Sequence, residues 1–576
     1  MTLTNTPIIQ PLTLIDLFCG AGGFSEGFAQ QGFKVLLGID NWRPAIDSFN
    51  HNHGTNSRVM DVLELKDDIA KINALPDSDV ILGSPPCVSF SSSNRSGKAD
   101  KSLGLTLIET FLRVVAVKKH QPNSCLKAWF MENVSRSAHH LPEFYTFEKL
   151  GLSDWASTHD IDPAAIAVQI AGNMVIINSA DMGSPQSRKR AVCGEIVHIG
   201  HFVVPNKTHR SIKEDELLPL HRTLDDIRSV LPRPDMERSE VAVRDPNYSH
   251  VRIPQSQLTD HFYDTGLYRT EWLNSRHLKV NHPFMGTMSF PEDGSRPSRT
   301  ITATKIGTSR EALIYRSERD RVGDGEYRTP TVREAASIMG FPISYQFLGS
   351  EGAKWRLVGN AVCPALGRAL AATLLNGLQR PINEQPEIRP LGILTGVLNL
   401  NTYIEKIFDE QPTRNKGSRF RRHPFKNGNL TITLSNYDIT TSGASNGQWL
   451  SSVQYGNGDG FPSVEYPDGF FDSMEPMIKK LPNGEEFLQI INNGFSERIA
   501  TASALQSMYE AQRSFDGYLE PTELIEEVAR LAERFDPDQE LVGQGDQVIF
   551  RKLLIPKRQI LALYAVNKIA SIANKR

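Results

Sequence analysis

The sequence is poor in cysteine, because its 576 residues contain only five. These are scattered singly and form no CxxC pair: Cys19, Cys87, Cys125, Cys193 and Cys363. Such a dispersed, odd-numbered set argues against a disulfide framework and against a structural zinc site. One of them can still be a nucleophile, which only its local context can identify.

Long apolar runs and an excess of charge are also missing. No stretch of 18 or more apolar residues occurs, so we expect no membrane span. The first residues lack the basic region and cleavage site of a signal peptide, which predicts a cytosolic protein. The net charge of −3 does not indicate nucleic-acid binding, but a large enzyme needs only one basic face for that.

Buried strands alternate with helices through the first 200 residues. Apolar runs at 12–18, 34–40, 79–84, 128–133 and 174–181 are typical of strands, and segments such as 23–31 and 106–119 of helices. This alternation predicts an α/β fold whose mostly parallel sheet is covered on both faces.

Changes in texture divide the rest of the chain. We expect a core at residues 1–200, a polar, histidine-rich region at 201–295 and a segment at 296–380 that completes the core. The Pro/Glu-rich stretch 381–391 predicts a linker, and residues 392–576 a separate domain of mixed α+β structure.

A glycine-rich turn follows the first predicted strand. Asp16 and Phe18 lead into Gly20 and Gly23, and a helix begins there. Glycines let a ligand approach the backbone, and a helix N-terminus offers free N–H groups to it. The turn alone does not establish a cofactor site, because any tight strand-to-helix turn favours glycine.

Acidic residues follow at the ends of the next segments. Asp40 lies 20 residues after Gly20, a position suited to binding ribose hydroxyls, and Asp61 precedes Val62 further on. Each aspartate could instead cap a helix. Their order along the chain favours a site for an adenosine group.

Two prolines directly precede Cys87, beyond a predicted buried strand. Pro85 and Pro86 restrict the backbone, and a loop rich in Ser, Gly and Lys follows. A free thiol has a pKa near ~8.5 and needs help to become a nucleophilic thiolate. The alternative, a small buried cysteine at a strand end, does not explain the rigid prolines and the loop.

These segments together resemble the ordered signature blocks of the DNA cytosine-C5 methyltransferase family. The resemblance covers about residues 12–380 and rests on the blocks at 16–24, 85–87, 132–134, 186–190, 296–302, 331–342 and 359–362. It implies the Rossmann-like fold of S-adenosylmethionine-dependent methyltransferases, with a small target-recognition region. It also implies S-adenosylmethionine as methyl donor, no metal, and double-stranded DNA as the substrate.

The resemblance assigns roles to individual residues. Cys87 would attack C6 of a flipped-out cytosine, Glu132 would contact N3 and the exocyclic amine, Arg188 would contact O2, and Arg190 would support the same site. Without the resemblance, a structural ion pair would explain Glu132, and a solvated basic patch would explain both arginines. Positions around the cofactor are implied for Phe18, Gly20, Gly23, Asp40, Asp61, Val62, Asn360 and Val362.

The chain departs from the family pattern in places. Val88 and Leu357 stand where glutamine is usual, and Trp42 lies one position beyond the usual stacking aromatic. Base reading is expected within 241–294, where polar candidates for DNA contact are Arg252, Gln255, Gln257, Arg269, Asn274, Arg276, His277 and Lys279.

The C-terminal extension resembles no family that we recognise. A basic cluster at 414–426 could bind phosphates or be a solvated surface. The alternatives to a DNA methyltransferase are a tRNA cytosine methyltransferase with the same blocks and a non-catalytic DNA-binding scaffold. We expect a monomeric bacterial enzyme of a restriction–modification or phage-defence system, acting at the nucleoid beside a separate restriction endonuclease.

Overall fold

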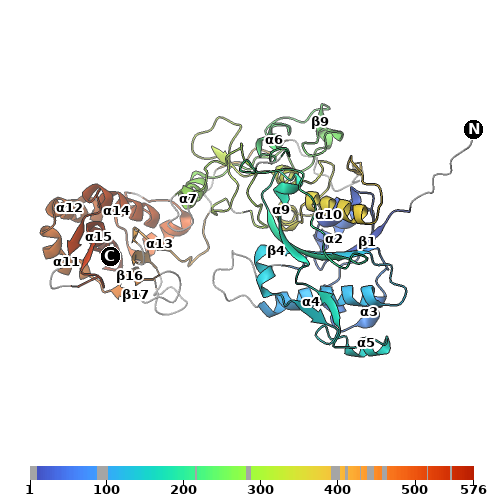
Figure 1. Ribbon diagram of the computed structural model, residues 1–576. Coiled ribbons are helices and arrows are strands. Elements are labelled where there is room, and N and C mark those ends of the chain that lie inside the picture. Colours follow the sequence, from blue (N-terminus) through green and yellow to red (C-terminus); the bar gives the residue numbers. More distant parts are fainter. Residues whose placement is uncertain are drawn as a thin grey trace, which may run out of the picture. The chain divides into compact units, whose positions relative to one another are not determined.

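The computed structural model consists of two compact units, Met1–Ile407 and Phe408–Arg576, shown in Figure 1. It describes residues 10–86, 101–214, 217–280, 287–305, 307–390, 403–408, 413–427, 430–436, 447–456, 463–515, 517–544 and 548–575. Cys87 and the loop after it therefore lie outside the described residues.

A six-stranded sheet forms the centre of the first unit, in the order β2-β1-β3-β4-β8-β7. Its strands are β1 (Thr13–Leu17), β2 (Lys34–Ile39), β3 (Val80–Gly83), β4 (Ala128–Val134), β7 (Met174–Asn178) and β8 (Lys189–Ile196). The first four are parallel, whereas β8 is antiparallel to both β4 and β7. The α/β prediction and the five expected strands are confirmed; β8 and its antiparallel pairing were not foreseen.

Both faces of this sheet are buried, because successive residues of a strand point to opposite sides. Leu12 and Leu14 join one core, whereas Ile15 and Leu17 join the other. The first core contains side chains of α1 (Gly23–Ala29), α2 (Arg43–His53), α8 (Val332–Met339), α9 (Glu351–Asn360) and α10 (Pro364–Gly377). The second contains those of α3 (Ile69–Asn73), α4 (Lys101–His120) and α5 (Ser153–Thr158), so α10 and α4 lie on opposite sides of the sheet (Figure 1).

The chain returns to its first strand near residue 360. A Cβ at Gly27 of α1 would lie 2.3 Å from the carbonyl oxygen of Pro364. A Cβ at Gly367 of α10 would lie 2.6 Å from the carbonyl oxygen of Phe24. The two helices therefore touch through their backbones. The long apolar stretch Glu351–Gly377, which has the length and composition of a membrane span, is mostly buried in this packing.

The region at 201–295 contains α6 (Asp225–Arg228), β9 (Ala242–Arg244), β10 (Arg252–Pro254) and α7 (Arg269–Val280). The short strands β11 (Tyr315–Arg316) and β12 (Tyr327–Arg328) follow it. Trp272 of α7 shares a small core with Leu267 and Ile314. Ile314 and Tyr327 thus pack with α7, whereas the neighbouring Leu313 and Tyr315 belong to the first core of the sheet.

The stretch expected to be a linker is fastened to the first unit. The side chain of Gln31 and the backbone of Asn383 exchange two hydrogen bonds, and Arg389 donates to the carbonyl of Asn52 at 3.1 Å. Further on, Ile404 bridges to Tyr263 in the recognition region. The division between the units therefore falls at 407/408 rather than at 391/392.

The second unit is an α+β domain, as predicted. Its sheet contains β13 (Arg421–Arg422), β14 (Lys426–Asn427), β15 (Leu430–Ser435), β16 (Leu450–Tyr455) and β17 (Ser463–Tyr466), all paired antiparallel. Its helices are α11 (Phe470–Lys479), α12 (Gly484–Ile490), α13 (Ala502–Ala511), α14 (Pro521–Phe535) and α15 (Lys557–Lys575). Phe420, from the predicted basic cluster, is 1% exposed and belongs to this core.

Candidate active site

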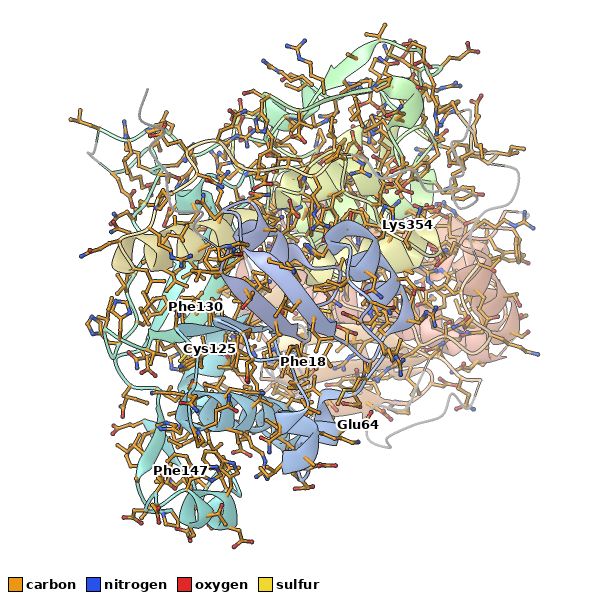
Figure 2. The ribbon with its side chains drawn as sticks, turned by 90° about the vertical axis from the view of Figure 1, so that its right-hand side faces the viewer. Phe18, Glu64, Cys125, Phe130, Phe147 and Lys354 are labelled. Carbon is orange, nitrogen blue, oxygen red and sulfur yellow. The ribbon has the colours of Figure 1, made fainter. Side chains whose placement is uncertain are left out.

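The turn after β1 has the backbone conformation that its glycines allow. Phe18, Gly20 and Gly22 have φ angles of 58°, 54° and 93°, in the left-handed region that favours glycine. A Cβ added at Gly20 would meet nothing within 4 Å, whereas one at Gly23 would lie 2.3 Å from the carbonyl oxygen of Val362. The turn is thus open at Gly20 and closed by the 361–363 segment at Gly23. Phe18, labelled in Figure 2, directly follows the last residue of β1.

Asp40 is fixed beside this turn at the end of β2. Its Oδ2 accepts a hydrogen bond from the Gly20 N–H at 3.0 Å, and its Oδ1 accepts one from the Trp42 N–H at 2.9 Å. The guanidinium of Arg356 lies 4.7 Å from the centre of the Trp42 ring. The turn, the acid and the aromatic residue therefore form one continuous surface.

Asp61 and Val62 follow on the same side. Asp61 Oδ1 accepts from the Leu63 N–H at 2.9 Å, so it also caps the short helix there, and Val62 is buried. Asp61 is close enough to Asp40 for its charge to raise the Asp40 pKa, an increase that burial mainly causes. Asn360, by contrast, is exposed at the end of α9.

Asp16 lies beneath the turn and is 1% exposed. Its Oδ2 accepts from the Ser25 hydroxyl at 2.6 Å, while its Oδ1 is buried with no partner among the described residues. Burial, helped by the neighbouring Asp40 charge, raises the pKa of Asp16 to about 7. Asp16, Asp40 and Asp61 thus make the surface around the turn suited to a positively charged ligand.

The segment that leads to Cys87 is anchored on two sides. The Ser84 hydroxyl donates to the carbonyl of Phe18 at 3.0 Å, and the Asn133 amide donates to the carbonyl of Pro85 at 3.2 Å. Asn133 comes from the block at 132–134, which the sequence placed in the same site. Pro85 is therefore held next to both the glycine turn and the end of β4.

Glu132 and Arg190 meet at the end of β4. Val134 is opposite Arg190 in the β4–β8 register, so Glu132 lies two residues away on the same face. Arg190 Nε lies 2.8 Å from Glu132 Oε1, and their side chains are 14% and 8% exposed. A carboxyl and a guanidinium thus stand together at the end of β4, next along the strand to the Asn133 that binds Pro85.

Arg188 binds backbone carbonyls. Its guanidinium donates to the carbonyls of Ile301 at 3.2 Å and of Gly359 and Ala361, each at 3.1 Å. With 4% of its surface exposed, it joins the segment after the recognition region to the turn before α10. Of the two arginines, Arg190 and not Arg188 therefore lies beside Glu132.

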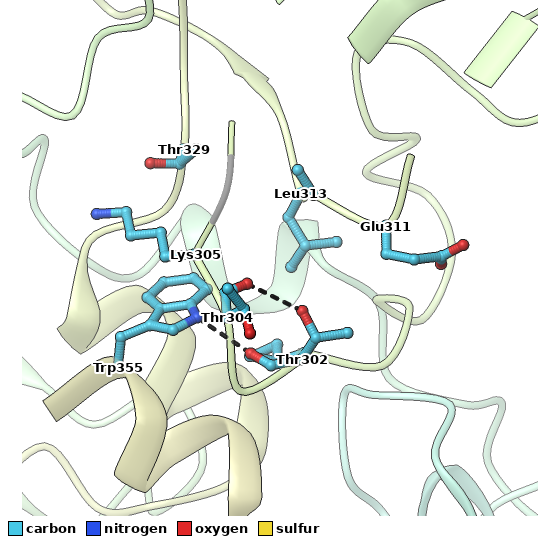
Figure 3. Close-up of a pocket in the computed structure, with 9 residues that line it drawn as sticks. Thr302, Thr304, Lys305, Glu311, Leu313, Thr329 and Trp355 are labelled. Atoms are coloured by element: carbon cyan, nitrogen blue, oxygen red, sulfur yellow. Dashed lines mark hydrogen bonds between the residues drawn. The ribbon is translucent and has the colours of Figure 1, made fainter. Parts of the chain in front are cut away.

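The small pocket in Figure 3 is a packing feature, and none of the predicted site residues is among those that line it. Trp355 Nε1 donates to the carbonyl of Thr302 at 3.0 Å, which holds the segment after 301 against α9. The cavity of about 10 Å³ has room for about one water molecule. It is too small for a nucleoside.

The described cysteines lack the features of a nucleophile. Burial raises the pKa of Cys19 and Cys193 far above the ordinary value. Partial burial and the charges of two nearby aspartates raise the pKa of Cys125. Cys363 is buried. Within the described part of the chain, no group of three or more His, Cys, Asp or Glu side chains is arranged to hold a metal ion.

Comparison with known proteins shows the family of the first unit. Residues 12–376 match the family model of the C-5 cytosine-specific DNA methylases. The Type II methyltransferase M.HgiDI of Herpetosiphon aurantiacus is 27% identical over 380 residues, which are 65% of this chain and 98% of that protein. M.MthTI of Methanothermobacter thermautotrophicus is 26% identical over 379 residues, 65% of this chain and 99% of that protein.

Among solved structures, the methyltransferase EhMeth of Entamoeba histolytica aligns with 64% of this chain and 99% of its own, with 14% identity and a TM-score of 0.36. The relatives' full lengths thus correspond to the first unit, and residues beyond 376 lie outside the family domain. The family model covers more than half of the chain. The protein therefore belongs to the C-5 cytosine-specific DNA methylase family.

Proposed function

We propose that this DNA cytosine-5 methyltransferase methylates a flipped-out cytosine through a covalent bond between Cys87 and C6. C6 and C5 cannot be reached within a stacked duplex, so the base must leave the helix. The observation that carries the proposal is the joint placement of Pro85, Asn133 and the Glu132–Arg190 pair at one sheet edge.

Cys87 would act as a thiolate that adds to C6. The electron pair of the C5–C6 double bond then becomes available at C5, which attacks the methyl group of the donor. Loss of the C5 proton afterwards re-forms the double bond and expels the Cys87 thiolate, so that the ring is aromatic again. The nucleophile is regenerated, and the only net transfer is of the methyl group in exchange for one proton.

Glu132 and Arg190 would stabilise the charge that develops on the ring during addition. A carboxyl that shares a proton can hydrogen-bond N3 and the exocyclic amine, and a guanidinium beside it can bind O2. Arg190 fits this role because it lies 2.8 Å from Glu132. Arg188 would support it indirectly, by holding the backbone at 301 and 359–361.

S-adenosylmethionine fits the surface around the glycine turn, and it supplies an electrophilic methyl group there. Gly20 leaves open space above the turn, and Asp40 and Trp42 offer a carboxylate and a ring to the ribose and adenine. The buried, unpartnered oxygen of Asp16 matches the positive charge of a sulfonium. We infer that Phe18, Gly20, Gly23, Asp40, Asp61, Val62, Asn360 and Val362 line this site.

We further propose that the enzyme modifies specific sequences in duplex DNA as part of a restriction–modification or phage-defence system. The support is that its relatives are Type II methyltransferases. It would act as a monomer in the bacterial cytoplasm, with a separate restriction endonuclease as its counterpart.

The test is to incubate the protein with labelled S-adenosylmethionine and genomic DNA, and to map 5-methylcytosine by bisulfite sequencing. We expect label in DNA at a defined sequence, none with Cys87→Ser, and cofactor affinity within a few-fold in that variant. Label in tRNA but not in DNA would favour the alternative substrate. Label in neither would overturn the proposal, and loss of cofactor binding in Cys87→Ser would make Cys87 structural.

A further inference from the structure

Helix α7 presents an exposed face that carries arginine in the middle of the recognition region. With about 3.6 residues per turn, positions 269, 273, 276, 277 and 280 share one side of the helix. All five are exposed: Arg269, Leu273, Arg276, His277 and Val280. The described residues offer Arg276 no ion pair, and Leu273 and Val280 are 39% and 40% exposed.

The other side of α7 is held firmly. Trp272 Nε1 donates to the carbonyl of Gly323 at 2.8 Å, and the Ser275 hydroxyl donates to that of Ser309 at 3.1 Å. The Lys279 side chain is fully buried, and its Nζ donates to Glu292 Oε1 at 3.0 Å. Lys279 is thus an anchor of the helix rather than the DNA contact that the sequence suggested.

The same contacts link α7 to the segment at 186–190, which leads into β8. Glu292 also pairs with Arg299, which lies one residue after Ser298. Ser298 forms a bridge with Gln186, and the Ser187 N–H donates to its carbonyl at 2.9 Å. A short chain of direct contacts therefore runs from α7 to the strand that carries Arg190.

We propose that the exposed face of α7 enters the major groove of the DNA substrate and reads its sequence, with Arg276 contacting a base. The major groove of B-DNA admits a single helix, and an arginine can donate two hydrogen bonds to O6 and N7 of guanine. This inference rests on the proposed function. It adds the element that recognises the target sequence.

The charge and the apolar residues of this face favour DNA over a protein partner. Its two arginines are complementary to phosphates, while Glu271, the only acid of the helix, lies on another side and accepts from the Tyr268 N–H at 2.9 Å. Exposed aliphatic side chains are suited to the methyl group of thymine. An acidic protein surface would also attract the arginines; in that case both alanine variants would methylate the duplex like the control.

The experiment compares Arg276→Ala and Arg269→Ala with Arg530→Ala, in the full-length protein. Arg530 is a matched control because it is an exposed helical arginine of α14 in the second unit, with a side chain 72% exposed. One lost base contact should lower kcat/KM for the target duplex about 5- to 150-fold, whereas the KM for S-adenosylmethionine should not change. Bisulfite mapping should show relaxed selection at one position of the target sequence for Arg276→Ala.

Arg276→Lys separates base reading from phosphate binding, because lysine keeps the charge but not the planar pair of donors. Arg276→Lys should therefore select that position of the target sequence as loosely as Arg276→Ala does. Full restoration of selectivity by lysine would overturn base reading by Arg276. If both alanine variants stay within twofold of Arg530→Ala while the enzyme methylates DNA, α7 is not the reading element; absence of methylation by the wild type would instead refute the proposed function.

Discussion

Replacing each arginine of the 186–190 block by alanine should have opposite consequences. In Arg188→Ala, three buried carbonyl oxygens lose their donor. An unsatisfied buried acceptor costs about 1–3 kcal/mol, so the loss should be roughly 3–6 kcal/mol after partial relaxation. Thermal unfolding should then begin on the order of 10 °C lower, and kcat of the folded enzyme should stay within about tenfold.

Arg190→Ala breaks a single ion pair whose arginine is 14% exposed, so its effect on stability should be smaller. It removes the cation beside Glu132, and loss of one donor of this kind costs about 10²–10³ in kcat. Differential scanning fluorimetry measures the first effect, and single-turnover methylation of a target duplex measures the second. A stable Arg188→Ala protein with a strongly reduced kcat, together with an active Arg190→Ala protein, would refute the proposal that Arg190 binds the ring and Arg188 holds the backbone.

Three further perturbations test the cofactor site and the extension. In Gly23→Ala, the new Cβ would lie 2.3 Å from the carbonyl oxygen of Val362. We expect the free energy of unfolding to fall by about 1–3 kcal/mol and calorimetry to show weaker cofactor binding. Unchanged values would contradict the close packing. Burial raises the pKa of Asp16 to about 7, and a cationic cofactor favours the ionised form, so affinity should rise about tenfold from pH 6 to pH 8. A flat profile in the wild type, or the same slope in Asp16→Asn, would count against that role. Glu405 Oε1 pairs with Arg321 at 2.5 Å. Glu405→Ala should therefore raise the KM for DNA and leave kcat unchanged, and Glu405→Asp should restore the wild-type KM. A fall in kcat as large as the rise in KM would exclude a positioning role for Glu405.

The parallel part of the fold was predictable because both faces of β1, β3 and β4 bury apolar side chains. Strand β8 was missed because it begins with Lys189 and Arg190 and contains Glu195. Glu195 is 5% exposed, and its carboxylate pairs with Lys119 of α4 at 2.8 Å. A charge satisfied by a partner 76 residues away leaves no trace in the local pattern of hydrophobic residues.

The sequence names candidate residues for the site, but it could not give their arrangement. Arg188 and Arg190 are two residues apart, and both positions suit a strand face that meets Glu132. Which arginine meets it depends on the register of β8 against β4, where Arg190 is opposite Val134. Register is a tertiary property, set here by strands whose partners lie far away along the chain.

The start of the extension belongs to the enzyme's own architecture, although the family domain ends at 376. The Glu387 N–H donates to the carbonyl of Gln30, at the end of the helix that begins in the cofactor turn. Further on, the Asp264 N–H donates to the carbonyl of Ile404, and Lys406 Nζ donates to that of Gly266, just before α7. Residues of 383–389 and 404–406 thus bind both the first unit near the end of α1 and the segment before α7.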